Sequence, residues 1–165
     1  IFQALGLQDM EGERTERFKV VADLDFLRQT DAEWDKERQS MLNVCSDCHS
    51  ENFARQELAR GDDMIRETGL LMAEAIEVVA DLYARGVLDQ PGEYIQAFPD
   101  ILAFHDAQSS IEQKLFRMFQ EYRMRSFQGV FHANPDYALW YGWSRMRQTL
   151  TEIQDLAQEL SDRHE

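Results

Sequence analysis

Two cysteines and a histidine stand together in one short segment, Cys45-Ser46-Asp47-Cys48-His49. They are the only cysteines among the 165 residues of the sequence. Two thiols separated by two residues can each form a thioether bond to a vinyl group of haem, and the histidine that follows can bind the iron as its proximal ligand. The segment therefore predicts one c-type haem attached at Cys45 and Cys48, with His49 as an iron ligand.

Two other kinds of site use the same residue types. A dithiol redox pair of the thioredoxin type is typical of a βαβ setting, whereas the residues around this motif have a helical pattern. A zinc site needs four ligands, and because the sequence has no second cysteine pair, scattered histidines or carboxylates would have to complete it. Both sites stay open as alternatives to haem.

An iron held by His49 needs a sixth ligand or an open position, and the chain has 4 histidines in all. His105 precedes Asp106, whose carboxylate could orient the imidazole, and His132 lies in a predicted turn between the last two helices. Each is a candidate distal ligand, with a hydrogen-bonded loop histidine as the alternative. His164 is expected on the surface near the C-terminal end. Methionines on helix stripes are expected to fill the core instead of binding iron: Met64, Met72, Met118 and Met146.

The charge of the chain excludes some classes of partner. A net charge of −14 argues against nucleic acid and anionic membranes, because both attract clusters of Lys and Arg. No run of about 18 apolar residues is present, so no membrane-spanning helix is expected. Arg117, Arg123 and Arg125 form a local cluster. They are expected to face solvent or to pair with nearby Glu, with haem propionates or an acidic edge of another subunit as the alternative partners.

A covalently attached haem also predicts where the protein acts. Bacteria attach haem to such motifs outside the cytoplasm, so a periplasmic or other extracytoplasmic location is expected. The first residues, Ile1 to Gly6, have neither a basic segment nor a long apolar core, so they do not form a secretory signal. We therefore expect a processed mature protein or a piece of a longer polypeptide.

Helical signals dominate the sequence. Thr30 and Glu33 form a capping box that predicts a helix running to the haem motif, and Ser50 can cap a long helix that Gly86 ends. Gly61 and Gly69 inside the long helix predict a kink or a close packing contact. The apolar stripe of this helix comprises Leu58, Ile65, Met72, Ile76, Val79 and Tyr83.

Two further helices are predicted in the second half of the chain. One begins at a capping box of Ser109 and Glu112 and ends at Gly129, and the other begins at Asn134-Pro135. The last helix carries a seam with three-four spacing: Trp143, Met146, Leu150, Ile153, Ala157 and Leu160. The length fits one domain with a sizeable core.

These elements predict an all-α fold, an up-and-down bundle of three long helices and a shorter one, with the haem motif in the N-terminal third. Residues 30–165 would form this bundle. Residues 1–29 are expected to form an extended arm or a short helix, and residues 87–108 a connection.

Three features together resemble the C-terminal helical domain of the octahaem hydroxylamine oxidoreductases and their hydrazine-oxidising and nitrite-reducing relatives. The first is the helix from Trp34 that leads into the Cys45–His49 motif, and the second is the long helix ending near Gly86. The third runs from Arg123-x-Arg125 through Gly129 and Pro135-Asp136-Tyr137 to Trp140 and Gly142. The resemblance covers about residues 30–160.

The resemblance implies one haem-bearing domain of a larger multihaem oxidoreductase of nitrogen compounds, with further haems in an upstream domain to which residues 1–29 would be the link. It implies a periplasmic homotrimer, electron transfer along closely spaced haems, and a redox partner cytochrome. Oxidative members of the family carry a tyrosine cross-linked to the catalytic haem of a neighbouring subunit, and Tyr137 best matches it. His132 and Tyr141 depart from the pattern expected of those members. The residues alone leave open a stand-alone monohaem electron-transfer cytochrome or a haem-free helical interaction module.

Overall fold

The computed structural model describes residues 1–23, 30–90, 98–101, 107 and 109–164. Within these residues the chain is helical, and the β-type pairing is limited to an isolated bridge between Gln8 and Arg14. The predicted all-α class is therefore confirmed for the part that the structure describes. His105, one of the two candidate distal ligands, lies outside the described residues.

The elements follow one another along the chain with two π-helical segments, η2 and η3, inside otherwise α-helical rods. They are α1 (Glu16–Asp23), α2 (Asp31–Ser46), α3 (Glu51–Ala84), α4 (Ser110–Arg117), η2 (Met118–Arg123), α5 (Met124–Phe131), α6 (Pro135–Tyr137), η3 (Ala138–Trp143) and α7 (Ser144–His164). The segments α4, η2 and α5 form one rod, and α6, η3 and α7 form the next.

Side-chain caps begin the helices where the sequence predicts them. At α2 the Thr30 hydroxyl accepts a hydrogen bond from the Glu33 backbone N–H, while the Glu33 carboxylate accepts one from the Thr30 N–H. Ser109 and Glu112 make the same reciprocal pair at α4. Both predicted capping boxes are confirmed. Side chains also cap the other two predicted starts, Ser50 at α3 and Asn134 at α6.

Two glycines that were predicted to end helices behave differently. Gly86 follows α3 with a φ of 67°, the left-handed conformation expected of a C-terminal glycine. Gly129 does not end its helix, so that prediction was wrong: it is buried, and α5 continues to Phe131. Ala133, with a φ of 50°, takes the left-handed turn instead. Gly129 is needed for packing, because its backbone lies directly against the backbone of Ala138 and leaves no room for a side chain.

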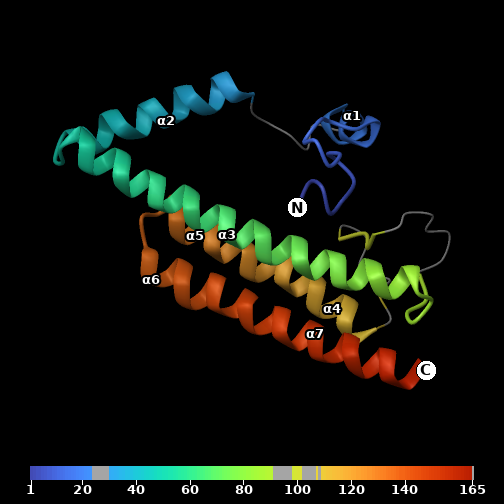
Figure 1. Ribbon diagram of the computed structural model, residues 1–165. Helices are drawn as coiled ribbons and strands as arrows, with labels where there is room; N and C mark the ends of the chain where they lie inside the picture. The colour runs from blue at the N-terminus through green and yellow to red at the C-terminus, as the bar shows by residue number, and fades with distance from the viewer. Residues whose placement is uncertain (24–29, 91–97, 102–106, 108, 165) are drawn as a thin grey trace.

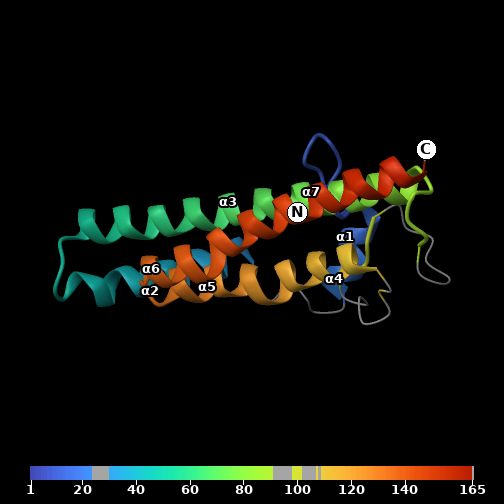
Figure 2. The same ribbon diagram turned by 90° about the horizontal axis from the view of Figure 1, so that it is seen from below.

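Three rods pack side by side, and the α4–α5 rod runs antiparallel to α3 and to the α6–α7 rod (Figures 1 and 2). The largest side chains buried in the core come from all three, namely Met72, Ile76, Leu82, Ile111, Leu115, Met118, Met146, Leu150 and Ile153. The predicted core role of Met72, Met118 and Met146 is therefore confirmed. Near the N terminus, Ile1, Ala4 and Leu5 pack against the same core.

The last two rods approach each other closely near their shared turn. A side chain on Gly129 would place its Cβ 2.5 Å from the backbone nitrogen of Ala138, and one on Gly142 would place it 2.5 Å from the backbone nitrogen of Ser126. Glycine is therefore required at both positions by space and not by backbone conformation. On α3, Gly61 packs against Val130, as expected, whereas Gly69 meets nothing within 4 Å.

Helix α2 lies outside the three-rod core. It turns back along α3 as a hairpin whose two helices diverge away from the turn (Figure 1). Leu42 is its buried residue among the side chains that the structure describes. The haem motif therefore lies at the tip of a hairpin that projects beyond the packed part of the molecule.

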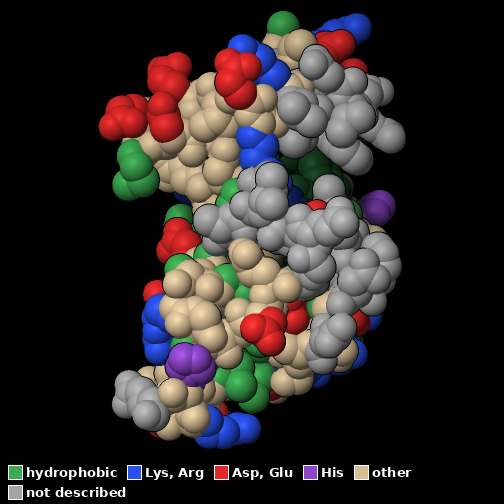
Figure 3. Space-filling view, turned by 90° about the vertical axis from the view of Figure 1, so that its right-hand side faces the viewer, with side chains coloured by type: hydrophobic (Ala, Val, Ile, Leu, Met, Phe, Trp, Pro, Cys, Tyr) green, Lys and Arg blue, Asp and Glu red, His purple; other side chains and the backbone are tan. Residues whose placement is uncertain are grey.

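The described surface carries charged side chains of both signs. On the end face seen in Figure 3, acidic and basic side chains are interspersed among the residues shown in colour. Several described arginines pair with a carboxylate three or four residues away along the chain, as Arg55 does with Glu51 and Arg163 with Glu159. None of the described helices is long and apolar enough to cross a membrane.

Candidate functional site

The motif occupies the last turn of α2 and the tight connection to α3. The backbone N–H groups of Cys48 and His49 both donate to the carbonyl of Cys45, at 3.2 and 2.9 Å. The Ser46 hydroxyl donates to the carbonyl of Leu42 at 2.7 Å. Local hydrogen bonds thus hold the two cysteines and the histidine in one turn, and Ser50 begins α3 immediately afterwards.

A cavity of about 940 Å³ opens beside this turn. Cys45 and His49 lie in its wall, while Cys48 is exposed at the turn and is not part of the wall. The cavity lies between three elements: α2, the first half of α3, and the corner from Gly129 to Pro135 that joins α5 to α6. Its volume is within the range of about 300–1,000 Å³ that is typical of cofactor sites.

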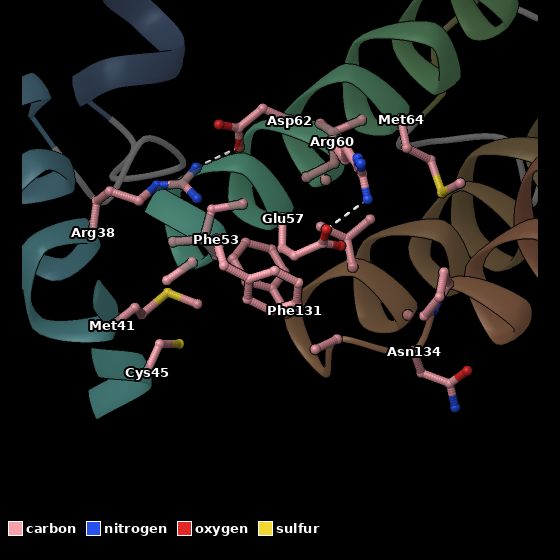
Figure 4. Close-up of a pocket in the computed structure, with 18 of the residues that line it drawn as sticks. Arg38, Met41, Cys45, Phe53, Glu57, Arg60, Asp62, Met64, Phe131 and Asn134 are labelled. Atoms are coloured by element: carbon pink, nitrogen blue, oxygen red, sulfur yellow. Dashed lines mark hydrogen bonds and ion pairs between the residues drawn. The ribbon is translucent and has the colours of Figure 1, made fainter. Parts of the chain in front are cut away.

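The wall of the cavity is mainly apolar, and several of its large side chains are open to solvent. Trp34 is 41% exposed, Phe53 46% and Phe131 48%. The His49 ring lies against that of Phe53, with 4.9 Å between the ring centroids. The close-up shows Met41 and Cys45 on α2 and Phe131 on the corner (Figure 4). Exposed aromatic rings around one concave site favour a large apolar occupant.

Haem fits the residues that are present. Cys45 and Cys48 are both free thiols, which is the form that reacts with vinyl groups, and His49 supplies an imidazole in the wall. The aromatic rings offer apolar surface for a macrocycle. Within the described residues, no group of three or more His, Cys, Asp or Glu is placed to hold a metal ion, so these residues do not assemble the alternative zinc site.

Two ion pairs add charge to the cavity wall. Arg38 on α2 pairs with Asp62 on α3, and Arg60 pairs with Glu57 at 2.5 Å within α3 (Figure 4). The Arg38 guanidinium also lies over the Trp34 ring, 5.3 Å from its centroid. The first pair joins the two helices of the hairpin, whereas the second is a surface pair of one helix.

Of the two candidate distal ligands, the described one, His132, does not lie in the wall of the cavity. His132 caps α5 and is exposed, and its neighbours Phe131 and Ala133 line the cavity while His132 itself does not. Met64 does line it, but it lies about 20 Å along α3 from Glu51, too far to share one iron with His49. His164 ends α7, at the end of the molecule opposite the motif (Figure 1). The identity of the distal ligand stays a prediction.

Tyr137 lies at the corner, as its sequence position predicts. Its backbone N–H donates to the Asn134 side chain at 3.0 Å, and its half-buried ring lies 5.1 Å from that of Tyr141. Leu139 and Trp140 beside it are exposed. Among the described residues no hydrogen bond of its hydroxyl is found.

The arginine cluster divides into different environments. Arg125 pairs with Glu121 at 2.9 Å, as expected of a surface arginine, and Arg117 is exposed. Within the described part of the chain, Arg123 does not pair with a glutamate: its guanidinium lies 5.1 Å from the ring centroid of Phe119 and 4.6 Å from that of Phe127. Its Nε is buried without a hydrogen-bond partner, and burial lowers the pKa of this guanidinium.

The cavity itself was not predicted from the sequence. On α2 the lining residues Trp34, Arg38, Met41 and Cys45 recur at intervals of four, three and four, which places them on one helical face. This spacing was the available signal, and it was obscured because Arg38 interrupts the apolar pattern. The contribution of the Gly129–Pro135 corner depends on tertiary packing and leaves no local signal.

Comparison with known proteins agrees with this site. A family model described as "Seven times multi-haem cytochrome CxxCH" matches residues 15–93, which include the motif. A probable nitrite reductase–hydroxylamine oxidoreductase fusion protein of Kuenenia stuttgartiensis is 22% identical over 169 residues, covering 78% of this chain and 20% of the relative. These matches support a hydroxylamine oxidoreductase-like multihaem cytochrome domain. The resemblance found in the sequence is thereby confirmed at this level.

A solved structure supports the same relationship. It is described as a reducing HAO-like protein complex of Kuenenia stuttgartiensis, HAO being hydroxylamine oxidoreductase, and it matches with a TM-score of 0.65 and 25% identity. The match covers 73% of this chain and 32% of the solved one. The chain thus spans about a fifth to a third of the length of the relatives it matches. The CxxCH family indicates covalently bound haem c.

Proposed function

We propose that this chain carries one haem c, attached through Cys45 and Cys48 with His49 as proximal ligand, and that this haem serves electron transfer in a larger multihaem oxidoreductase. The observation that carries the proposal is the position of the motif: Cys45 and His49 lie in the wall of an apolar cavity of about 940 Å³. Haem c supplies a one-electron iron couple, whose potential the surrounding protein adjusts.

The residues of the chain have separate roles in this proposal. The two thiols fix the cofactor to the end of α2, and the hydrogen-bonded turn between α2 and α3 orients His49. Trp34, Phe53 and Phe131 cover apolar surface and exclude water from it. Water exclusion lowers the local dielectric constant and so strengthens the influence of nearby charges on the couple.

For the complete protein we propose oxidation of hydroxylamine or hydrazine, or reduction of nitrite, at a catalytic haem outside this chain. The names of the relatives support this range of substrates. We further propose an upstream multihaem domain in the same polypeptide, with residues 1–29 as the link. A homotrimer, a redox partner cytochrome and a periplasmic location complete the proposal.

Loss of both thiols tests haem attachment. After maturation in a host that attaches haem, a Cys45→Ala/Cys48→Ala variant should lose the Soret band and the covalent mass of haem, since both thioethers are absent. A Ser46→Ala/Asp47→Ala variant keeps both thiols in the same turn and should keep both signals. Absence of a Soret band from the wild-type chain would contradict the proposal.

The number of haems on the native polypeptide distinguishes the proposal from its alternative. Mass spectrometry of the native protein should find several covalent haems on a chain much longer than 165 residues. A single haem on a chain of this length would instead identify a stand-alone monohaem cytochrome. Free thiols and no haem would identify a helical interaction module.

Tyr137 carries a narrower proposal, a contact with the catalytic haem of a neighbouring subunit. Its place in an exposed aromatic group with Trp140 and Tyr141 supports this. In the full-length protein, Tyr137→Phe should keep folding and haem content while abolishing hydroxylamine or hydrazine oxidation. Tyr141→Phe removes the neighbouring hydroxyl and should keep the activity. Full activity of the Tyr137 variant would refute this role.

A further inference from the structure

The cavity beside the haem motif has two arginines in its wall, and they differ in exposure. The Arg60 side chain is 74% exposed and pairs with Glu57 on its own helix. The Arg38 side chain is only 21% exposed, lies over the Trp34 ring and pairs with Asp62 across the hairpin. Arg38 is therefore the more desolvated of the two cations, and its orientation is fixed from both helices.

Arg38 also has a defined position relative to the attachment site. It lies seven residues before Cys45 on the same face of α2, which corresponds to about 10 Å along the helix axis. A haem that is attached through its vinyl groups carries its two propionates on the opposite edge of the macrocycle. The cavity wall thus has thiols at one end and a partly buried guanidinium two turns away.

The chemistry of the guanidinium suits this anionic edge. Arginine has five N–H donors in a planar fork that matches a carboxylate, so it can bind Asp62 and a propionate at the same time. We propose that Arg38 is the propionate-binding residue of this haem site, held in place by Asp62 and Trp34. The proposal rests on the haem attachment proposed above. The simpler alternative is a salt bridge that only joins α2 to α3.

The test uses the full haem-loaded chain and four variants: Arg38→Gln, Arg38→Lys, Asp62→Asn and Arg60→Gln. Covalent haem content is measured first, because its absence from the wild type would refute the proposed function itself. The propionate bending band in the resonance Raman spectrum and the midpoint potential are then compared, with circular dichroism to verify folding. Arg38→Gln and Asp62→Asn break the same ion pair, so any effect that comes only from losing the link between α2 and α3 should be the same in both variants.

A propionate contact predicts different results for these variants. Arg38→Gln should shift the propionate band and lower the potential, because loss of a nearby positive charge favours ferric iron. Arg38→Lys should keep most of the potential, and Asp62→Asn should raise it. Arg60→Gln removes an equal but solvent-screened charge and should change neither quantity. An unchanged band in Arg38→Gln, or a potential that falls equally in Arg38→Gln and Asp62→Asn, would overturn the proposal.

Discussion

The two halves of α3 have the same helical geometry and opposite surroundings. From Thr68 to Tyr83 the helix contributes eight buried residues to the three-rod core, whereas from Glu51 to Glu67 only Ala54 is buried. The apolar stripe predicted from the sequence continues through both halves, but Leu58 and Ile65 line the cavity while Met72 and Ile76 fill the core. An apolar stripe therefore indicates which face of a helix is turned away from solvent. In the second half of α3 this face packs against the other two rods, and in the first half it borders the cavity.

This difference predicts unequal costs for the same substitution in the two halves. Leu150→Ala deletes a fully buried side chain and should reduce the free energy of unfolding by about 2–5 kcal/mol. Leu58→Ala, in the half-buried cavity wall, should cost much less in the haem-free chain. Chemical denaturation followed by circular dichroism measures both. Equal losses would show that the cavity half is packed as tightly as the core.

The sequence predicted those parts of the molecule whose determinants are local. The capping boxes at Thr30 and Ser109 and the left-handed Gly86 each depend on neighbouring residues, and each is confirmed. Gly129 was wrongly predicted to end a helix, because its requirement for glycine comes from Ala138 on the next rod. The attachment motif could be found from its spacing, but the third wall of the cavity could not, since it comes from residues about 80 positions later.

The close approach of the last two rods gives a second, smaller effect. Gly129→Ala would place a methyl group 2.5 Å from the Ala138 backbone nitrogen, which should cost about 1–3 kcal/mol through displacement of the rods. Gly69→Ala, in the middle of α3 with nothing within 4 Å of the added methyl group, should instead stabilise the protein by about 0.5–1 kcal/mol. Thermal unfolding measures both changes. A stabilising Gly129→Ala would show that α5 and η3 are not in close contact.

The two capping boxes have the same sequence signature in the two environments. Glu112 is buried and accepts hydrogen bonds from the Tyr83 hydroxyl and from Ser109, so it joins α3 to the start of α4. Glu33 is exposed and bonds only to Thr30 among the described residues.

Replacing the two glutamates should therefore have different effects on stability. Glu112→Ala should cost about 1–3 kcal/mol of global stability, whereas Glu33→Ala should loosen only the first turn of α2. Urea unfolding measures the first effect and backbone chemical shifts the second. If Glu33→Ala reduced global stability as much as Glu112→Ala, α2 would be part of the cooperative core, contrary to its position outside the three rods.

The smallest expected effect is the pH dependence of the α2 cap. Hydrogen bonds from the Thr30 backbone N–H and then from its hydroxyl lower the pKa of Glu33. A lowered carboxyl pKa means that the ionised cap stabilises the helix start above the unfolded pKa of about 4.3, and that this contribution disappears as the pH falls through the lowered value. The α-carbon chemical shifts of the first turn of α2 should thus move toward coil values in acid, while those of the core rods stay unchanged. Glu33→Gln cannot ionise and should remove this pH dependence. Equal acid shifts in the Gln variant would assign the change to another carboxylate. A wild-type first turn that stays helical in acid would show that the ionised cap does not hold the start of α2.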